Sequence, residues 1–272
     1  MAAEQGEAFA FGRNWSCFLR VLDEGRVQEA EKSLRSMLET DDPRGRRFLD
    51  IGCGSGLFSL AARRLGAEVR SFDYDTDSVA CAQELKRRSL PDDAGWIVER
   101  GSVLDREYVA ALGQHDVVYS WGVLHHTGDL WRAIDNAILA VAPGGRLFVS
   151  IYNDQGLWSR IWARVKRTYN GLPEPLRVPF AIAVMLPREA LFLLGALALF
   201  RPGAYVRSWT QYRRNRGMSR RHDLIDWVGG YPFQVAKPED VFGFCRKRGF
   251  TLVRLKTCGG GLGCNEFVFE RR

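Results

Sequence analysis

Apolar and polar residues alternate with two different periods along the central part of the chain. Short apolar runs predict β-strands, whereas longer segments with apolar residues three or four positions apart predict helices. The predicted strands span residues 47–51, 68–72, 96–99, 116–120 and 146–152. The predicted helices lie near residues 57–65, 76–89, 105–112 and 129–142. Regular alternation of this kind implies right-handed βαβ units and a parallel sheet with helices on both faces.

The two ends of the chain complete this picture. A helical pattern covers residues 14–40, with a break predicted at 23–25. The chain finishes with a predicted helix at 239–248 and strands at 251–257 and 265–270. We therefore divide the 272 residues into an N-terminal helical cap (1–45), an α/β core (46–152), a helical insertion (153–237) and a final helix and hairpin that complete the core (238–272).

The insertion is far longer than an ordinary loop, so it must have structure of its own, and its prolines and glycines predict short helices. Pro187, Arg188 and Glu189 interrupt its apolar run at 178–200. The two pieces hold about nine and eleven residues, fewer than the roughly twenty that span a bilayer, so we predict no transmembrane segment. A lid, an acceptor pocket, a helix lying on a membrane and a core or homodimer contact stay open as roles.

Positive charge gathers in the same insertion. The whole chain carries +7, but residues 153–221 hold thirteen Lys and Arg against three acidic residues, a local charge of +10. The positive field therefore belongs to this one segment, and exposed arginines without a partner are the alternative to an anionic ligand. The arginine-rich run at 212–221 could clasp an anionic acceptor or contact anionic lipid headgroups.

Cysteine usage and the N-terminus suggest the compartment. The six cysteines form no C-x-x-C pair and have no His partner at zinc spacing, so we predict reduced thiols and no metal site. The first fifteen residues contain two glutamates and lack the basic and apolar regions of a signal peptide. We therefore expect a cytoplasmic protein.

The most informative motif is FLDIGCGSGLF at residues 48–58, where Gly52, Gly54 and Gly56 alternate between a predicted strand and a predicted helix. Glycines at such a turn let a ligand approach bare backbone, and the helix N–H groups then face that ligand. Leu57 replaces the third glycine of a dinucleotide site, and no Gly-Lys-Ser/Thr follows as in a P-loop. A structural βα turn without a ligand is the alternative.

An acidic residue ends the second predicted strand. Asp73 lies seventeen residues after Gly56. A carboxylate can accept two hydroxyl donors at once, which suits a ribose diol. The alternative is a helix N-cap, although Asp75, Thr76 or Asp77 could serve there instead.

These features resemble the motifs of S-adenosylmethionine-dependent class I methyltransferases. The first motif would hold the amino-acid end of the cofactor; Tyr74 would pack on the adenine, and Ser102 and Val103 would lie beside it. The segment from Asp116 to His126 resembles the family's fourth-strand region, and residues 141–147 resemble its loop before the fifth strand. The motifs occur in the same order along the chain as in the family. The cofactor contacts implied by the resemblance are Asp50, Gly52, Cys53, Gly54, Gly56, Asp73, Tyr74, Ser102, Val103, Ser120 and Trp121.

The same resemblance implies a doubly wound, mostly parallel seven-stranded sheet whose last strand is antiparallel. The pattern is similar to bacterial small-molecule enzymes grouped with the ubiquinone-pathway O-methyltransferases. The chain departs from the family at Ser102, where many members have an acidic residue. Which residue meets the adenine amine is therefore open.

His125 and His126 follow the fourth predicted strand, at the edge where ligands bind in such sheets. Methyl transfer to a hydroxyl or thiol needs a proton acceptor, and a histidine is suited to that role or to orienting the acceptor. We favour His126 over His125; a histidine that only holds the loop is the alternative. The loop lacks the Asn/Asp-Pro-Pro-aromatic pattern of base-amine methylation, so oxygen, sulfur or carbon acceptors are expected.

The acceptor is expected to be a small molecule, either anionic or lipophilic. Its candidate contacts are Trp15, Arg213, Arg214, Tyr231 and Asn265. Nucleic acid is not expected as a partner, although a nucleic-acid- or protein-modifying methyltransferase that docks through the basic insertion is the alternative function. A catalytically silent cofactor-binding subunit is a third hypothesis.

Overall fold

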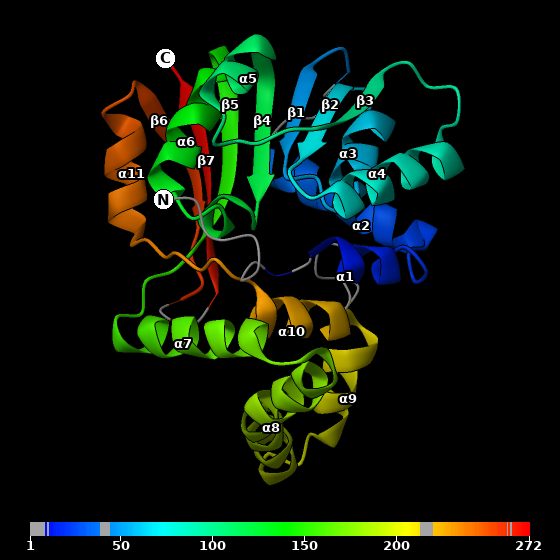
Figure 1. The fold of residues 1–272 in the computed structure, drawn as a ribbon, viewed down its shortest axis with the longest axis vertical. Helices are drawn as coiled ribbons and strands as arrows, with labels where there is room; N and C mark the ends of the chain where they lie inside the picture. Colours follow the sequence, from blue (N-terminus) through cyan, green and yellow to red (C-terminus); the bar gives the residue numbers. More distant parts are fainter. Residues whose placement is uncertain (1–8, 10, 39–43, 213–219, 260, 262) are drawn as a thin grey trace.

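A seven-stranded sheet forms the centre of the molecule, as the computed structural model shows (Figure 1). The structure describes residues 9, 11–38, 44–212, 220–259, 261 and 263–272. The strands, in the spatial order β3-β2-β1-β4-β5-β7-β6, are β1 (Arg47–Ile51), β2 (Glu68–Asp73), β3 (Trp96–Arg100), β4 (His115–Trp121), β5 (Val141–Tyr152), β6 (Phe250–Lys256) and β7 (Cys264–Arg271). Strands β1 to β5 are parallel, and β7 is antiparallel to both β5 and β6. The predicted sheet is confirmed.

Helices cover both faces of the sheet, because each carries an apolar stripe that must be buried. One face packs against α2 (Glu24–Leu38), α3 (Leu57–Arg64) and α4 (Thr76–Ser89). The other packs against α5 (Arg106–Ala111), α6 (Leu130–Leu139) and α11 (Pro238–Arg246). The doubly wound architecture predicted from the sequence is therefore present.

The N-terminal helix α1 (Phe11–Phe18) is separated from α2 by residues 19–23, so the break begins four residues before the predicted one at 23–25. It lies against α4 and α10 rather than against the sheet. The backbone N–H of Gly12 donates to the Asp75 carboxylate over 2.7 Å. This bond ties α1 to the cap of α4, two residues after β2 ends, so α1 overhangs the carboxyl edge of the parallel strands.

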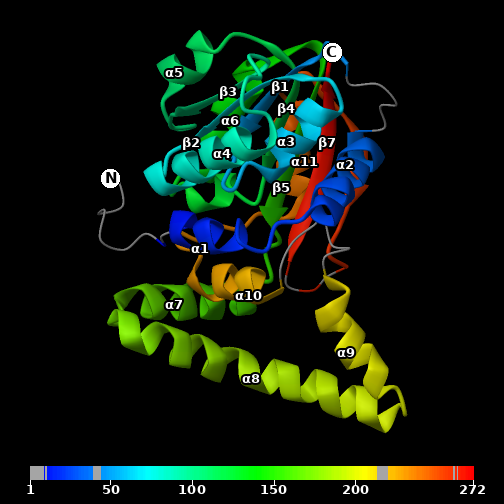
Figure 2. The same ribbon diagram turned by 90° about the vertical axis from the view of Figure 1, so that its right-hand side faces the viewer.

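The insertion is helical, as predicted, and consists in the described residues of α7 (Leu157–Gly171), α8 (Glu174–Ala198), α9 (Pro202–Thr210) and α10 (Arg220–Gly229). Figures 1 and 2 show it beyond the carboxyl edge of the sheet. Tyr169, Met185 and Val228 form a small core of its own between α7, α8 and α10.

The expected division of the apolar run into two short pieces is wrong. The helix α8 continues for 25 residues through both Pro179 and Pro187. A proline removes one N–H donor, but the flanking backbone can stay helical when the neighbouring bonds hold. By length and apolar composition alone α8 could cross a membrane, and only 17% of its most apolar window is buried within the protein.

Candidate active site

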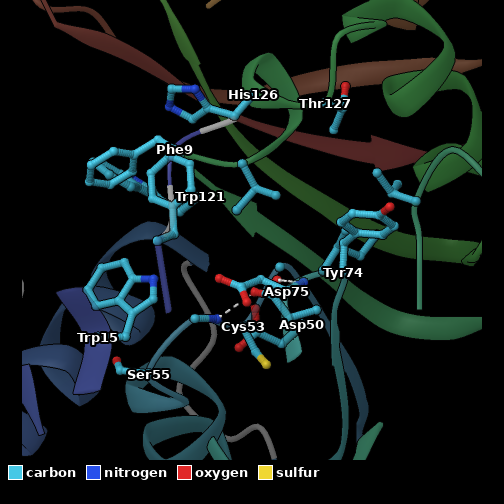
Figure 3. A pocket seen from close by; sticks show the side chains of 18 of the residues that line it. Phe9, Trp15, Asp50, Cys53, Ser55, Tyr74, Asp75, Trp121, His126 and Thr127 are labelled. Carbon is cyan, nitrogen blue, oxygen red and sulfur yellow. Dashed lines mark hydrogen bonds between the residues drawn. The ribbon is translucent and has the colours of Figure 1, made fainter. Parts of the chain in front are cut away.

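A cavity of about 1220 Å³ opens at the carboxyl edge of β1 to β4 (Figure 3). The loops that follow these strands form one side of it, and α1 and the insertion form the other. Figure 3 shows Asp50, Cys53 and Asp75 gathered at one end and His126 and Trp121 toward the other. The cavity therefore has a polar end under the sheet loops and a largely aromatic end under the insertion.

The glycine turn between β1 and α3 lines the polar end. Gly52 and Gly54 have φ values of +76° and +53°, a left-handed region that side chains disfavour. A Cβ on Gly52 would lie 2.3 Å from Val123, and one on Gly54 would lie 2.8 Å from the Trp15 indole. Glycine is thus required here both by conformation and by space.

Gly56 has a different role from the one expected. Its φ is also positive, but a Cβ there would meet Ala82 at 3.0 Å and the Trp96 ring at 3.3 Å. It does not line the cavity. The structure therefore gives Gly56 a packing role between α3 and α4.

Asp73 lies at the end of β2 with both carboxylate oxygens facing backbone donors. Oδ2 accepts the N–H of Gly54, and Oδ1 accepts the N–H of Asp75, each over 3.0 Å. Asp75, and not Asp73, caps α4 by accepting the N–H of Asp77. Burial raises the pKa of Asp73 to about 6, against the lowering effect of these hydrogen bonds. Each oxygen keeps acceptor capacity for a ligand hydroxyl.

Two further side chains of the first motif are buried beside Asp73. The Asp50 carboxylate accepts the Ser59 hydroxyl over 2.6 Å, and burial raises its pKa to about 7. Burial and the two nearby carboxylates also raise the pKa of Cys53 well above its ordinary value. Cys53 is therefore a neutral thiol in the wall of the cavity.

Tyr74, Ser102 and Val103, which the resemblance places beside the adenine, all line the cavity. The Tyr74 side chain is 61% exposed, and the guanidinium of Arg100 lies 5.7 Å from its ring centre. The Ser102 hydroxyl accepts the N–H of Leu104, and Asp105 caps α5. An exposed aromatic face opposite an apolar loop makes a slot for a flat ring.

Of the four candidates at the end of β4 and in the loop after it, Trp121 and His126 line the cavity, whereas Ser120 and His125 do not. Successive strand residues point to opposite faces, so Ser120 points inward and donates its hydroxyl to the Ile51 carbonyl over 3.0 Å. His125 is fully buried, with its ring 4.0 Å from that of Tyr152. The predicted cofactor contact of Ser120 and the catalytic candidacy of His125 therefore lose support.

His126 is held at the aromatic end of the cavity. Its Nδ1 lies 2.6 Å from the Pro232 carbonyl, which can only accept, so Nδ1 carries the proton and Nε2 is an acceptor. Burial, helped by the nearby Lys166 ammonium, lowers the pKa of His126 to about 3. The ring is therefore neutral near pH 7, and its pKa lies far below the near-neutral value expected for a general base.

Among the predicted acceptor contacts, Trp15 and Tyr231 line the cavity. Asn265 is buried outside it, where it accepts the Cys258 N–H and donates to Asn153. These bonds fix the end of the β6–β7 hairpin, so the predicted contact of Asn265 with an acceptor loses support. Arg213 and Arg214 lie outside the described residues.

Sequence reasoning missed most of the aromatic end. The additional lining residues from the N-terminal segment and the insertion are Phe9, Phe11, Trp162, Arg188, Tyr212, Asp223, Leu224, Trp227 and Pro232. Their concentration of Trp, Tyr and Phe in a segment already expected to cover the site was the available signal. Their spacing alone could not show which of them faces inward.

The family of the chain follows from comparison with known proteins. A family model described as a methyltransferase domain matches residues 22–226. The chain is 34% identical over 116 residues to a ubiquinone biosynthesis O-methyltransferase of Cupriavidus pinatubonensis, covering 40% of this chain and 42% of that protein. A Burkholderia cenocepacia protein of the same name is 31% identical over 151 residues, covering 53% and 55%. The chain thus spans only about half the length of these curated relatives.

Solved structures share the fold at low sequence identity. Magnesium protoporphyrin IX methyltransferase from Synechocystis, solved with bound SAH, superposes with a TM-score of 0.54 at 16% identity, covering 91% of this chain and 84% of that one. An S-adenosylmethionine-dependent methyltransferase from Mesorhizobium loti gives 0.51 at 18% identity, covering 89% and 98%. The match over residues 22–226, three quarters of the chain, shows that the chain belongs to the methyltransferase-domain family.

Proposed function

We propose that the protein transfers the methyl group of S-adenosylmethionine to an oxygen atom of a small, largely apolar acceptor. The observation that carries the proposal is the cavity with two different ends. The glycine turn and Asp73 lie at its polar end, and His126 lies at its aromatic end. Sulfur or carbon acceptors are the alternatives within the same chemistry. We place the reaction in the cytoplasm.

The polar end fits the cofactor. The bare backbone of Gly52 and Gly54 would hold its amino-acid end, and Asp73 would accept the ribose hydroxyls. Tyr74 and the loop at Ser102 would enclose the adenine. When bound there, the sulfonium supplies an activated methyl group for in-line displacement, so the protein must mainly align the acceptor.

The aromatic end suits an acceptor with a flat, apolar body. Phe11 packs beside His126 with ring centres 5.0 Å apart, and Trp121, Tyr152 and Trp227 line the same region. Arg188 is the charged side chain that α8 contributes to this lining, and it would tolerate an anionic substituent. A phenolic acceptor would combine these properties.

We assign His126 to orienting the acceptor hydroxyl. Its Nδ1–H bond to Pro232 fixes the ring, and Nε2 can accept a hydrogen bond from the hydroxyl. A pKa of about 3 makes full proton transfer to this imidazole unfavourable. The hydroxyl proton would then leave to solvent as the oxygen attacks the methyl carbon.

The test is methyl transfer from labelled S-adenosylmethionine to a panel of phenols and catechols. Replacing His126→Gln keeps a hydrogen-bonding group but loses the ring, and it should lower kcat by about 10- to 100-fold while leaving cofactor affinity unchanged. His115→Gln is the matched control, because His115 lies at the opposite, amino end of β4. Equal turnover in wild type and H126Q would remove His126 from the mechanism.

A further inference from the structure

The apolar side chains that face solvent are concentrated in one part of the molecule. Of the 22 large exposed apolar side chains in the described residues, sixteen lie between residues 157 and 209. Ten of these lie in the second half of α8, in α9 or between the two helices, a segment that we call the α8–α9 arm (residues 186–210). Phe200, at the tip between the two helices, is 93% exposed. Soluble proteins rarely leave such a surface uncovered.

The arm has little protein to pack against. Its two helices contact each other, with the rings of Phe192 and Tyr205 5.8 Å apart and the Tyr205 hydroxyl 3.3 Å from Glu189. Figure 2 shows the arm extending away from the sheet. From residue 190 to residue 200 the chain has no charged or polar side chain, so the helix end is apolar on every side. A helix of this kind is normally buried in protein or lipid.

The charge around the arm favours an anionic lipid surface over a second copy of the chain. Arg188, Arg201 and Arg207 flank the apolar stretch, and Glu189 is the acidic residue within the arm. Two copies that met through this surface would bring the three arginines of one arm close to those of the other. Anionic headgroups attract arginines that lie next to an inserted apolar surface.

The path of the chain argues that the arm enters one leaflet and returns. The first half of α8 packs on α7, and α10, which follows the arm, packs on α7 and α1. Both ends of the arm therefore lie on the same side. If α8 crossed the bilayer, the chain would need a second apolar segment of about twenty residues to return. Residues 201–216 contain five arginines and so do not form such a segment.

We propose that the α8–α9 arm docks the protein on an anionic lipid bilayer. Residues 191–200 enter the acyl boundary, and Arg201 and Arg207 lie among the headgroups. Because Arg188 of the arm also lines the cavity, the docked arm would deliver a lipophilic acceptor directly to the aromatic end. This last step alone rests on the proposed function.

Sedimentation with vesicles tests the docking. Wild type should bind vesicles of phosphatidylcholine with phosphatidylglycerol about tenfold better than vesicles of phosphatidylcholine alone, and added salt should reduce the difference. The double variant Leu191→Glu, Leu194→Glu should lose about tenfold or more of this binding. The matched control is Ile97→Glu, Leu255→Glu, which places two acidic residues at exposed apolar positions on β3 and β6 and should bind as wild type does.

Cofactor affinity measured on each variant separates this inference from the proposed function. Failure of wild type to sediment with either vesicle, while S-adenosylmethionine still binds, would overturn the docking alone. Light scattering that shows a dimer, made monomeric by the Leu191 and Leu194 substitutions, would assign the surface to a second copy. Cleavage of the arm by a protease enclosed inside the vesicles would indicate a spanning helix and overturn the surface arrangement.

Discussion

Asp73 joins the glycine turn to the end of β2 and has acceptor capacity left on both oxygens. Replacing Asp73→Asn removes the charge and turns one oxygen into a donor. We expect S-adenosylmethionine affinity to fall by about 10- to 100-fold, since hydrogen bonds to a charged group contribute about 1.5–3 kcal/mol. Isothermal titration calorimetry measures this directly.

Asp105→Asn is the control for that substitution. Asp105 accepts the N–H of Tyr108 as the cap of α5, near the cavity but outside its lining. The substitution Asp105→Asn should change the free energy of unfolding by less than about 1 kcal/mol, because Asn is also a good N-cap. It should leave the affinity for S-adenosylmethionine unchanged. Equal cofactor affinity in D73N and wild type would refute the ribose assignment.

The raised pKa of Asp73 gives a pH dependence of defined sign. The pKa of Asp73 in the folded protein, about 6, lies above the ordinary value of 3.8, so the protonated carboxyl favours the folded protein without ligand. The resulting contribution to the free energy of unfolding is fully present below about pH 4. It is lost as the pH rises through 6. The cofactor instead needs the carboxylate, so its affinity should fall as pH drops below about 6. Titrations of wild type should show this fall, and D73N should lack it.

Individual side chains show which contacts of the candidate site could be predicted from the sequence. Asp73, Tyr74 and Trp121 could be placed at the cavity because each lies at the carboxyl end of a strand or directly after it. Ser120 lies on the opposite face of β4 from Trp121, an alternation that strand geometry already implied. Asn265 could not be judged, because its partner Asn153 is 112 positions away in the chain.

The turn between β1 and α3 separates two costs of a glycine substitution. Gly52 and Gly113 have the same φ of +76°, but a Cβ on Gly113 meets nothing within 4 Å. Gly113→Ala should therefore lose only the conformational term, about 1–2 kcal/mol of unfolding free energy, and keep cofactor affinity. Gly52→Ala adds the clash with Val123 at the ligand surface, so affinity should also fall by at least about tenfold.

Thermal unfolding and calorimetry on the two alanine variants measure both terms. Gly52→Ala and Gly113→Ala carry the same backbone strain, because both positions have the same φ. The difference in cofactor affinity between the two variants therefore measures the effect of the steric clash at Gly52. If G52A bound the cofactor as tightly as G113A does, the glycine turn would not be in contact with it.

Among the elements, the core was predictable and the insertion was not. The two-residue and 3.6-residue periods locate β1 to β5 and their helices within a few positions, because burial on both faces imposes a strict pattern. The helix α8 has apolar residues on all sides, so periodicity could not define it, and Pro187 suggested an end that does not exist. Its length depends on continued backbone bonding, which the sequence does not reveal.

In the whole molecule, the sheet edge supplies the polar end of the cavity and α1 with the insertion supplies the aromatic end. The polar end follows a family pattern, so the sequence motifs predicted it. The aromatic end depends on how the insertion packs over the sheet edge, and no local sequence pattern determines such long-range packing. The same distribution explains why the motifs indicate the methyl donor but not the acceptor.

A crystal structure with bound S-adenosylhomocysteine tests this arrangement most directly. We predict the ribose hydroxyls on Asp73, the amino-acid end on Gly52 and Gly54, the adenine beside Tyr74, and the sulfur facing His126 and the aromatic chamber. A product molecule found elsewhere, or with its sulfur turned away from that chamber, would contradict the proposed methyl transfer in this cavity.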